Sequence, residues 1–389
     1  TGKDYGNAFK TANSNWRSIH YPVTENIISG YEDVQPISAE DDVYYDLQEK
    51  NSKHTRSLKD FHNKFVKYML INKIAHYLQE NANMDKTYLM DYSVGRAGDL
   101  SKWKYSNIDF VLGIDLSKDN VINRSDSASA RYLESRKKYR HAKLRALFLQ
   151  GDSGQNVRSK QEAFSTTLDK QIIKSLFGSG DPPHAHAKYV FRHGMAREGF
   201  HISSCQFALH YFFASTHVLH RFLRNVSECT RINGYFIGTC YDGKQVFDSL
   251  QNEYGTFHVE KKGNLLCEIT KKYNRSINRF PADEESVGMR IDVYQESIGK
   301  TFPEYLVNFD YLSRLLENYG FVAVPQTELN VMGFDTSHGS FQSLFQKMKF
   351  EKAKNELEKQ NSFFGESENM SEEEKQISFL NRYFIYKKV

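Results

Sequence analysis

The stretch at residues 87–115, TYLMDYSVGRAGDLSKWKYSNIDFVLGID, decides the fold. It begins as a short apolar strand ending at Asp91, turns through Gly95 and Gly98 into a helix, and returns as a buried strand ending at Asp115. Glycines let the backbone approach a ligand closely, and an acid at the second strand end commonly binds ribose hydroxyls. The stretch predicts a site for a dinucleotide or S-adenosylmethionine, with a tight turn capped by an aspartate as the structural alternative.

Strands and helices continue to alternate outward from this stretch. Apolar runs predict further strands at 146–152, 200–207 and 234–239, and helical periodicity predicts helices over 58–78, 120–145, 156–175 and 214–231. This alternation is typical of a mostly parallel sheet with crossover helices, in which ligands bind beyond the carboxyl ends of the strands. Residues after 255 mix short strands with helices, and 350–376 form an acidic helix or loop.

Polar residues at two more strand ends narrow the choice of ligand. Asp152 and Ser153 end the third expected strand, where an aspartate can accept from an adenine amino group, and Gln206 ends the fourth. An Asx turn is the structural alternative for Asp152. Successive polar strand ends without a complete GxGxxG pattern favour S-adenosylmethionine over a dinucleotide.

Composition excludes several other classes of protein. The 389 residues are 39% hydrophobic and 26% charged, which is globular composition, and 52 Lys and Arg against 48 Asp and Glu give a net charge of +4. This balance permits a nucleic-acid partner without requiring one. No apolar stretch approaches the roughly 18 residues that a membrane span needs. The four cysteines form no CxxC pair, so we expect free thiols, no disulfide framework and no metal site.

Two motifs carry a resemblance to a known family. A GDLxKW run occupies residues 98–103 and a QFxxHY run occupies residues 206–211. Together with Gly113-Ile-Asp115 and Asp152-Ser153, they resemble the eukaryotic-type mRNA cap guanine-N7 methyltransferases over residues 58–389. The resemblance implies a class I, Rossmann-like α/β fold with a seven-stranded, mostly parallel sheet and inserted cap-binding elements. It also implies methyl transfer from S-adenosylmethionine to N7 of the guanine cap, with S-adenosylhomocysteine as product and no metal or general base.

The same resemblance implies roles for individual residues. Those expected to bind the cofactor are Lys67, Asp91, Ser93, Gly95, Asp115, Asp152, Ser153, Gln206 and Tyr211. Those expected to bind the cap are Asn63, Lys64, Arg96, Lys102, Arg131, His210, Glu304 and Tyr383, and His210, Tyr211 and Glu304 are the expected catalytic residues. The chain departs from the family pattern at four positions: Ser93 and Ala97 replace glycines, Arg96 replaces a lysine, and Lys64 replaces an asparagine.

Further details resemble the capping enzymes of large nucleocytoplasmic DNA viruses, of the African swine fever virus type. They are WRSIHYPVT at 16–24, FIGTCYDG at 236–243 and NRYFIYKK at 381–388. This likeness implies that residues 1–55 are a linker from an upstream guanylyltransferase region and that 56–389 are the methyltransferase domain. The absent initiator Met fits a piece of a longer capping enzyme that carries triphosphatase and guanylyltransferase domains. The expected partners are capped RNA, those upstream domains and viral transcription machinery, with no membrane; the expected location is the virion and cytoplasmic viral factories.

Three rival functions remain open at this stage. A non-catalytic module that stabilises a capping complex stays open because of the Ser93 and Ala97 departures. An RNA 2′-O-methyltransferase would need a Lys-Asp-Lys-Glu tetrad, which we do not find convincingly in the sequence. A dehydrogenase is disfavoured by the incomplete glycine pattern and by the QFxxHY run.

Overall fold

A computed structural model describes residues 54–82, 84–140, 142–182, 190–353 and 364–389. Contacts divide the chain into residues 1–42 and 43–389, and all described residues belong to the second unit. Residues 1–53 of the expected linker, together with parts of the 177–196 loop and of the acidic 350–376 stretch, lie outside the described residues. The boundary at residues 55 and 56 stays a prediction.

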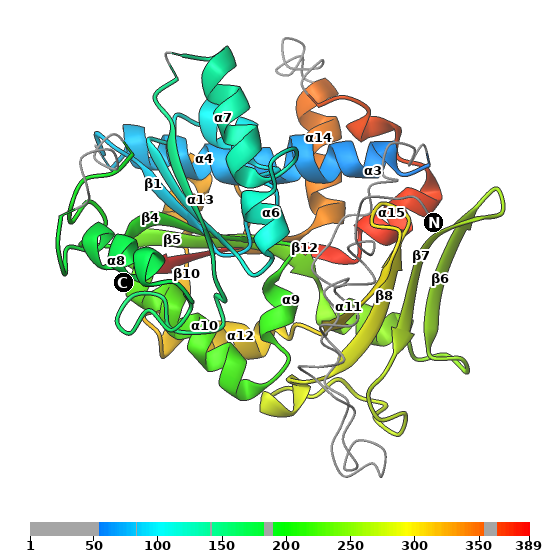
Figure 1. The fold of residues 1–389 in the computed structure, drawn as a ribbon. Coiled ribbons are helices and arrows are strands. Elements are labelled where there is room, and N and C mark those ends of the chain that lie inside the picture. Colours follow the sequence, from blue (N-terminus) through cyan, green and yellow to red (C-terminus); the bar gives the residue numbers. More distant parts are fainter. Residues whose placement is uncertain (1–53, 83, 141, 183–189, 354–363) are drawn as a thin grey trace, which may run out of the picture. The chain divides into compact units, whose positions relative to one another are not determined.

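The main sheet follows the order β10-β12-β5-β4-β1-β2-β3 (Figure 1). Its strands are β1 Tyr88–Asp91, β2 Phe110–Asp115, β3 Arg145–Gln150, β4 Phe200–Gln206, β5 Thr230–Tyr241, β10 Phe321–Ala323 and β12 Asn381–Lys388. Neighbours from β3 to β5 pair in parallel, whereas β12 is antiparallel to both β5 and β10. The predicted seven-stranded, mostly parallel sheet is confirmed, and the short β11, His338–Ser340, adds to it by pairing with β12.

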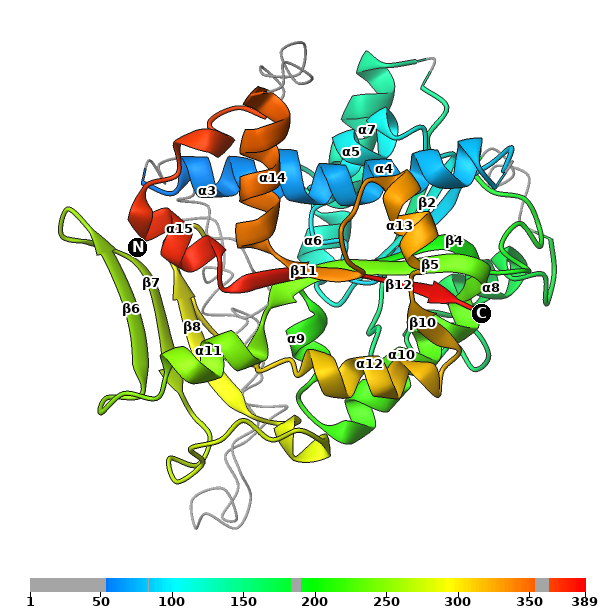
Figure 2. The same ribbon diagram turned by 180° about the vertical axis from the view of Figure 1, so that it is seen from behind.

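Helices cover both faces of this sheet, because its central strands bury residues on both sides. Figures 1 and 2 show α4 (Lys67–Glu80), α13 (Gln326–Met332) and α14 (Phe341–Ala353) on one side. The other side carries α8 (Thr167–Leu176), α10 (Thr216–Cys229) and α12 (Phe309–Glu317). Two separate hydrophobic clusters result, and alternate residues of β5 belong to each, Ile237 to the first and Phe236 to the second.

The long helix expected at 58–78 is present but is not uniform. It runs as α3 (Arg56–Asp60), a π-helical segment at Phe61–Val66, and then α4. The π-helix carries the residues just before Lys67, and its wider turn was not predicted. π-helical turns are rare and often occur at functional sites.

Two other helix predictions were wrong in extent. The helix expected at 120–145 is split into α6 (Lys118–Ile122) and α7 (Ala128–Lys138), because Asn123 turns the chain and Ser127 caps a new helix. The helix expected at 156–175 begins only at Thr167, where Thr166 supplies the N-cap. Asn156 instead accepts the amide of Lys160 and holds the preceding residues in turns.

A second sheet of four antiparallel strands follows α11 (Gly243–Ser249). Its strands are β6 Thr256–Lys261, β7 Asn264–Lys271, β8 Arg290–Gln295 and β9 Thr301–Tyr305. This insertion brings Glu304 on β9 next to α9, Leu209–Phe212, which follows β4 of the main sheet. The shorter helices α5 (Leu100–Tyr105) and α15 (Glu372–Ser378) complete the elements used below.

No helix in the described ranges is long and apolar enough to cross a membrane. All four cysteines are described, and each is buried and unbridged. Within the described residues, no group of three His, Cys, Asp or Glu side chains is placed to hold a metal ion.

Candidate active site at the carboxyl ends of the strands

Carboxylates from two strands accept hydrogen bonds from the backbone of the turn after β1. Asp91 Oδ1 accepts the amide of Ser93 at 3.1 Å, and Asp115 Oδ2 accepts the amide of Gly95 at 2.7 Å. Gly95 has φ +51°, a conformation that favours glycine, and a Cβ there would meet open space. A cofactor site beside this turn stays a prediction.

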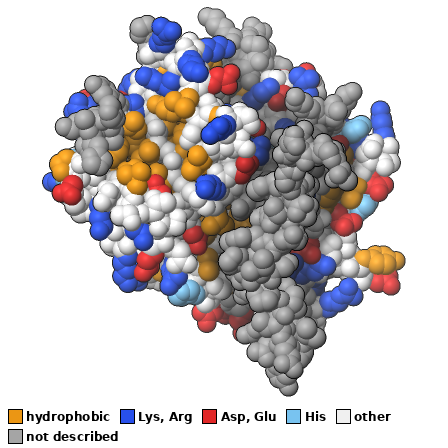
Figure 3. Space-filling model, in the orientation of Figure 1, with side chains coloured by type: hydrophobic (Ala, Val, Ile, Leu, Met, Phe, Trp, Pro, Cys, Tyr) orange, Lys and Arg blue, Asp and Glu red, His pale blue; other side chains and the backbone are white. Residues whose placement is uncertain are grey.

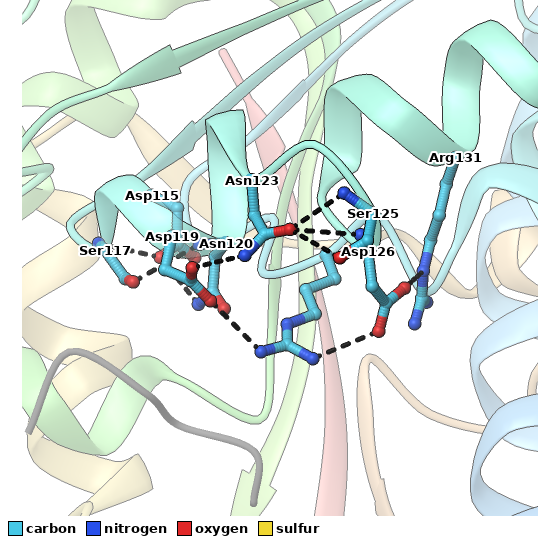
Figure 4. A network of polar contacts seen from close by, with 9 residues as sticks. Asp115, Ser117, Asp119, Asn120, Asn123, Ser125, Asp126 and Arg131 are labelled. Atoms are coloured by element: carbon cyan, nitrogen blue, oxygen red, sulfur yellow. Dashed lines mark hydrogen bonds and ion pairs between the residues drawn. The ribbon is translucent and has the colours of Figure 1, made fainter. Parts of the chain in front are cut away.

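Asp115 is the centre of a polar network (Figure 4). Besides Gly95, it accepts the amide of Ser117 at 3.0 Å and the Nδ2 group of Asn120 at 3.1 Å. Burial raises the pKa of Asp115, although these three hydrogen bonds oppose the shift. A carboxylate fixed at the end of β2 in this way suits the ribose role that the sequence predicts.

The same network engages two of the predicted phosphate-binding cations. Arg96 forms ion pairs with Asp119 at 3.2 Å and Asp126 at 3.1 Å, and its side chain is only 8% exposed. Arg131 pairs with Asp126 at 2.6 Å and keeps 41% of its side chain exposed. Their cap roles stay predictions, and Arg131 is the more accessible of the two.

Asp99 joins the predicted cofactor and cap cations in a second cluster. Its carboxylate lies 3.3 Å from Lys67 Nζ and 2.8 Å from Lys102 Nζ, and all three side chains are largely buried. Burial would raise the pKa of Asp99, but Lys102 and Lys67 hold it at about 2. Lys102 also donates to the carbonyl of Gly98 at 3.1 Å, so it braces the glycine turn from within.

Asp91 lies beside this cluster in a less favourable environment. Burial, and then the negative charge of Asp99, raise its pKa to about 7. The hydrogen bond from the Ser93 amide, and then the positive charge of Lys67, oppose this shift. A cationic ligand group near Asp91 would stabilise its carboxylate, which agrees with the predicted cofactor role.

The predicted residues at the ends of β3 and β4 lie at the same edge of the sheet. Asp152 Oδ1 accepts the amide of Gly154 at 2.8 Å, and the hydroxyl of Ser153 donates to the carbonyl of Tyr92 at 2.8 Å. Gln206 is buried between Ser204 and Thr239, at 3.2 Å and 3.1 Å. The Asx turn noted as the structural alternative is therefore present at Asp152, and its second oxygen takes no part in that turn.

His210 and Glu304 form a buried pair across the two sheets. Nε2 of His210 lies 3.6 Å from Oε2 of Glu304, and each residue is 4% exposed. Both ring nitrogens of His210 and Oε2 of Glu304 lack a hydrogen-bond partner among the described residues. Burial lowers the pKa of His210 to about 3 and raises that of Glu304 to about 8, so burial favours the neutral form of both groups. The Tyr211 ring packs 4.2 Å from the His210 ring.

The remaining predicted cap residues are placed less tightly together. Asn63 Nδ2 donates to the carbonyl of Lys59 at 3.0 Å, and Lys64 pairs with Asp60 at 2.8 Å while 43% of its side chain stays exposed. The Tyr383 ring packs on Phe334, and its hydroxyl donates to the carbonyl of Thr336 at 3.0 Å. The structure therefore shows Tyr383 engaged with the segment after α13, and its guanine-binding role stays a prediction.

Sequence reasoning missed His62, a residue of the π-helix. Its ring stacks on Phe207 at 5.2 Å and 18°, and its Nε2 lies 2.8 Å from the Ser378 hydroxyl. Phe207 itself has φ +53°, which is rare for a bulky side chain, and the Lys67 ammonium lies 5.6 Å from its ring centre. Local sequence carries no signal for this stack, because its partners are far apart in the chain.

These observations define the class of the protein. The sheet order with antiparallel β12, the open glycine turn and the carboxylates at the ends of β1, β2 and β3 are those of a class I S-adenosylmethionine-dependent methyltransferase. The roles of Asp115, Asp152 and Lys67 in binding the ribose, the adenine and the carboxylate of that cofactor stay predictions.

Comparison with known proteins identifies the family. The model of the mRNA (guanine-N(7))-methyltransferase domain matches residues 41–389, so the chain belongs to this family, whose methyl donor is S-adenosylmethionine. The chain is 23% identical to a probable mRNA-capping enzyme of Acanthamoeba polyphaga mimivirus, over 99% of this chain and 33% of that protein. It is 27% identical to the mRNA cap guanine-N(7) methyltransferase of Lodderomyces elongisporus, over 67% of this chain and 43% of that one.

The chain thus spans about a third of the mimivirus relative and less than half of the Lodderomyces one. It is also similar to the crystal structure of an S-adenosylmethionine-dependent methyltransferase from Clostridium acetobutylicum. That likeness is distant, with 10% identity, a TM-score of 0.41, and coverage of 84% of this chain and 96% of that one.

Proposed function

We propose that the protein transfers a methyl group from S-adenosylmethionine to N7 of the guanine cap of mRNA. The observation that carries the proposal is the buried His210–Glu304 pair: both ring nitrogens of His210 and Oε2 of Glu304 have no hydrogen-bond partner among the described residues. Buried polar groups are normally hydrogen-bonded, so these atoms suit a polar ligand that enters between α9 and β9. Guanine offers N1–H and 2-amino donors to a carboxylate and O6 as an acceptor.

The reaction mainly requires the protein to orient the guanine and the cofactor relative to each other. Guanine N7 carries no proton and is already nucleophilic, and the bound cofactor supplies the electrophilic methyl group. Orienting two reactants can supply about 7–11 kcal/mol of the barrier. Glu304 as a carboxylate would hold the guanine edge and stabilise the positive charge that develops on the purine. Tyr211, packed beside His210, would offer its ring to the flat base.

The cations divide into two groups in this proposal. Arg131 and Lys64 are partly exposed and would face the cap triphosphate. Arg96 and Lys102 are buried in ion pairs, so they would act mainly by holding the α6–α7 connection and the glycine turn in place. Neither assignment needs a metal ion.

We extend the proposal to a viral capping enzyme on the strength of the mimivirus relative. That protein is described as a probable mRNA-capping enzyme and is about three times as long as its match to this chain. Upstream triphosphatase and guanylyltransferase domains, association with viral transcription machinery, and work in the virion and in cytoplasmic viral factories follow as parts of this proposal.

The test is transfer of labelled methyl groups to GpppA, followed by identification of the methylated atom. We expect N7-methylguanine from the wild type. Glu304→Gln should lose at least about 2.7 kcal/mol of transition-state stabilisation, roughly a hundredfold in kcat/KM, and should keep S-adenosylmethionine binding by calorimetry. Glu268→Gln, on β7 of the same four-stranded sheet and 42% exposed, is the matched control and should retain full activity.

Two results would replace this proposal with a rival. Methyl groups on a ribose 2′-oxygen would indicate a 2′-O-methyltransferase. Absence of S-adenosylmethionine binding by the wild type would indicate a non-catalytic module. The positive φ of Ala97, +54°, is the observation that keeps the second rival in view, because a family glycine is replaced where the backbone favours glycine.

A further inference from the structure

Exposed aromatic rings and cations gather where α5 and α7 end. Lys104 and Tyr105 end α5, and Lys137, Lys138, Tyr139 and Arg140 end α7 or directly follow it; we call these six residues the α7 surface. Tyr105 is 50% exposed and Tyr139 is 41% exposed, which is high for aromatic side chains. In Figure 3, blue Lys and Arg side chains gather at the top of the view, where α7 ends in Figure 1.

The rings and cations of this surface are ordered against one another. Lys104 Nζ lies 4.8 Å from the Tyr105 ring centre and 3.4 Å from the Tyr139 ring centre. Lys138 Nζ lies 5.4 Å from the Tyr139 ring. Cation–π contacts of this kind hold a flexible cation beside an aromatic face. On this surface, positively charged side chains therefore lie next to exposed aromatic rings.

Within the part of the chain that the structure describes, Lys104, Lys137, Lys138 and Arg140 form no ion pair, although Glu134 lies one turn before Lys138 on α7. The last turn of α7 is basic, with Arg136, Lys137 and Lys138. At the start of α7, in contrast, Arg131 is paired with Asp126. A surface with excess positive charge and exposed rings matches single-stranded nucleic acid, which presents a phosphate backbone and unstacked bases.

The position of α7 links this surface to the candidate active site. Arg131, shown in Figure 4, lies near the start of the helix and belongs to the network around Asp115. Tyr139 follows Arg131 by eight positions in the sequence, which is about 12 Å along a helix axis. A polynucleotide that leaves a triphosphate held near Arg131 would need only a few nucleotides to reach Tyr139.

We propose that the α7 surface binds the single-stranded RNA that follows the cap. Phosphates contact Lys104, Lys137, Lys138 and Arg140, and bases stack on Tyr105 and Tyr139. This inference rests on the proposed function, because it takes capped RNA as the substrate. It adds a binding site outside the cap and cofactor pockets and predicts that the protein favours long capped RNA over a capped dinucleotide.

The test uses the full chain and two substrates, GpppA and a capped 20-nucleotide RNA. The surface variant is Lys138→Glu with Tyr139→Ala. We expect its KM for the capped 20-mer to rise about tenfold, as one lost stacking contact and one lost cation predict. Its kcat on the 20-mer, and its kcat and KM on GpppA, should match the wild type.

Fluorescence anisotropy with uncapped 20-nucleotide oligouridylate measures the surface without catalysis. The surface variant should bind about tenfold more weakly, and its plot of log K against log salt should be shallower by about 0.7 for the lost cation. The matched control is Lys262→Glu with Tyr254→Ala, which removes the same charge and ring from exposed positions around the second sheet; Tyr254 is 76% exposed. The control should bind like the wild type.

Two outcomes would overturn the proposal. Equal loss in the control would show a general charge effect, and wild-type RNA binding by the surface variant would assign the surface to another partner, such as an acidic protein. If the wild type methylates neither substrate, the proposed function fails, while the anisotropy measurement still decides whether the α7 surface binds RNA.

Discussion

At the scale of single residues, Glu304 should make the affinity for the cap depend on pH. Burial raises its pKa to about 8, so in the ligand-free pocket it is mostly protonated at pH 7. The guanine N1–H and 2-amino groups need the carboxylate form, so a proton must leave when the cap binds. Affinity for GpppA should therefore rise about tenfold per pH unit below 8 and level off above it.

Calorimetry of GpppA binding from pH 6 to 9 measures this dependence. At pH 7, the heat should also depend on the ionisation enthalpy of the buffer, because close to one proton is released. Glu304→Gln should bind weakly at every pH and without proton release. A flat pH profile for the wild type would contradict the assignment of Glu304 to the guanine edge.

Ala97 gives a second prediction at this scale. Its φ of +54° places a Cβ in the left-handed region, which costs about 1–2 kcal/mol. Ala97→Gly should therefore raise the free energy of unfolding by about 1 kcal/mol, measured by urea denaturation. Gly95, two residues earlier, has φ +51° and open space around its Cβ position, so it allows the opposite substitution to be tested. Gly95→Ala should lose a similar amount, and a less stable Ala97→Gly protein would refute the strain argument.

At the scale of elements, the π-helix at Phe61–Val66 places His62 over Phe207. The Lys67 ammonium lies 5.6 Å from the centre of the Phe207 ring, and we predict that Lys67 holds the carboxylate of the cofactor. His62→Ala removes the stack and the contact with Ser378, so Lys67 loses its support. The KM for S-adenosylmethionine should rise about 2- to 10-fold, which matches the free energy that one aromatic pair contributes. The value of kcat should change less.

Two matched variants separate positioning from simple stability. His62→Phe keeps a ring over Phe207 and should recover most of the loss in KM. His76→Ala removes an exposed histidine from the same long helix and should behave like the wild type. A rise in KM that tracks only the free energy of unfolding would show that His62 is structural.

The elements also show which predictions local sequence can support. Strands β1 to β5 were predicted because each is an apolar run bounded by turn residues, and the carboxylates that follow them were predicted with them. The residues before α8 were misread as helix because Val157 and Phe164 are buried from irregular turns, which a helical period does not distinguish. The π-helix was missed because it repeats nearly the same apolar spacing as an α-helix.

At the scale of the whole molecule, the candidate site joins two sheets. The cofactor end was largely predictable, because Asp91, Asp115 and Asp152 all follow strands of one parallel sheet. The cap end was not predictable from spacing, because Glu304 belongs to an inserted antiparallel sheet and meets His210 from 94 residues away. Only the family resemblance brought those two residues together before the structure was known.

The interior place of β12 has a consequence for synthesis of the chain. Strand β5 is complete by Tyr241, yet its partner β12 begins only at Asn381. While a ribosome makes the residues between them, the edge of β5 offers unpaired backbone groups to any strand it meets. The nascent chain therefore passes through a stage in which strands β1 to β5 are formed and the edge of β5 is still unpaired. Rapid release from the ribosome, or a chaperone that shields this edge, would favour correct folding.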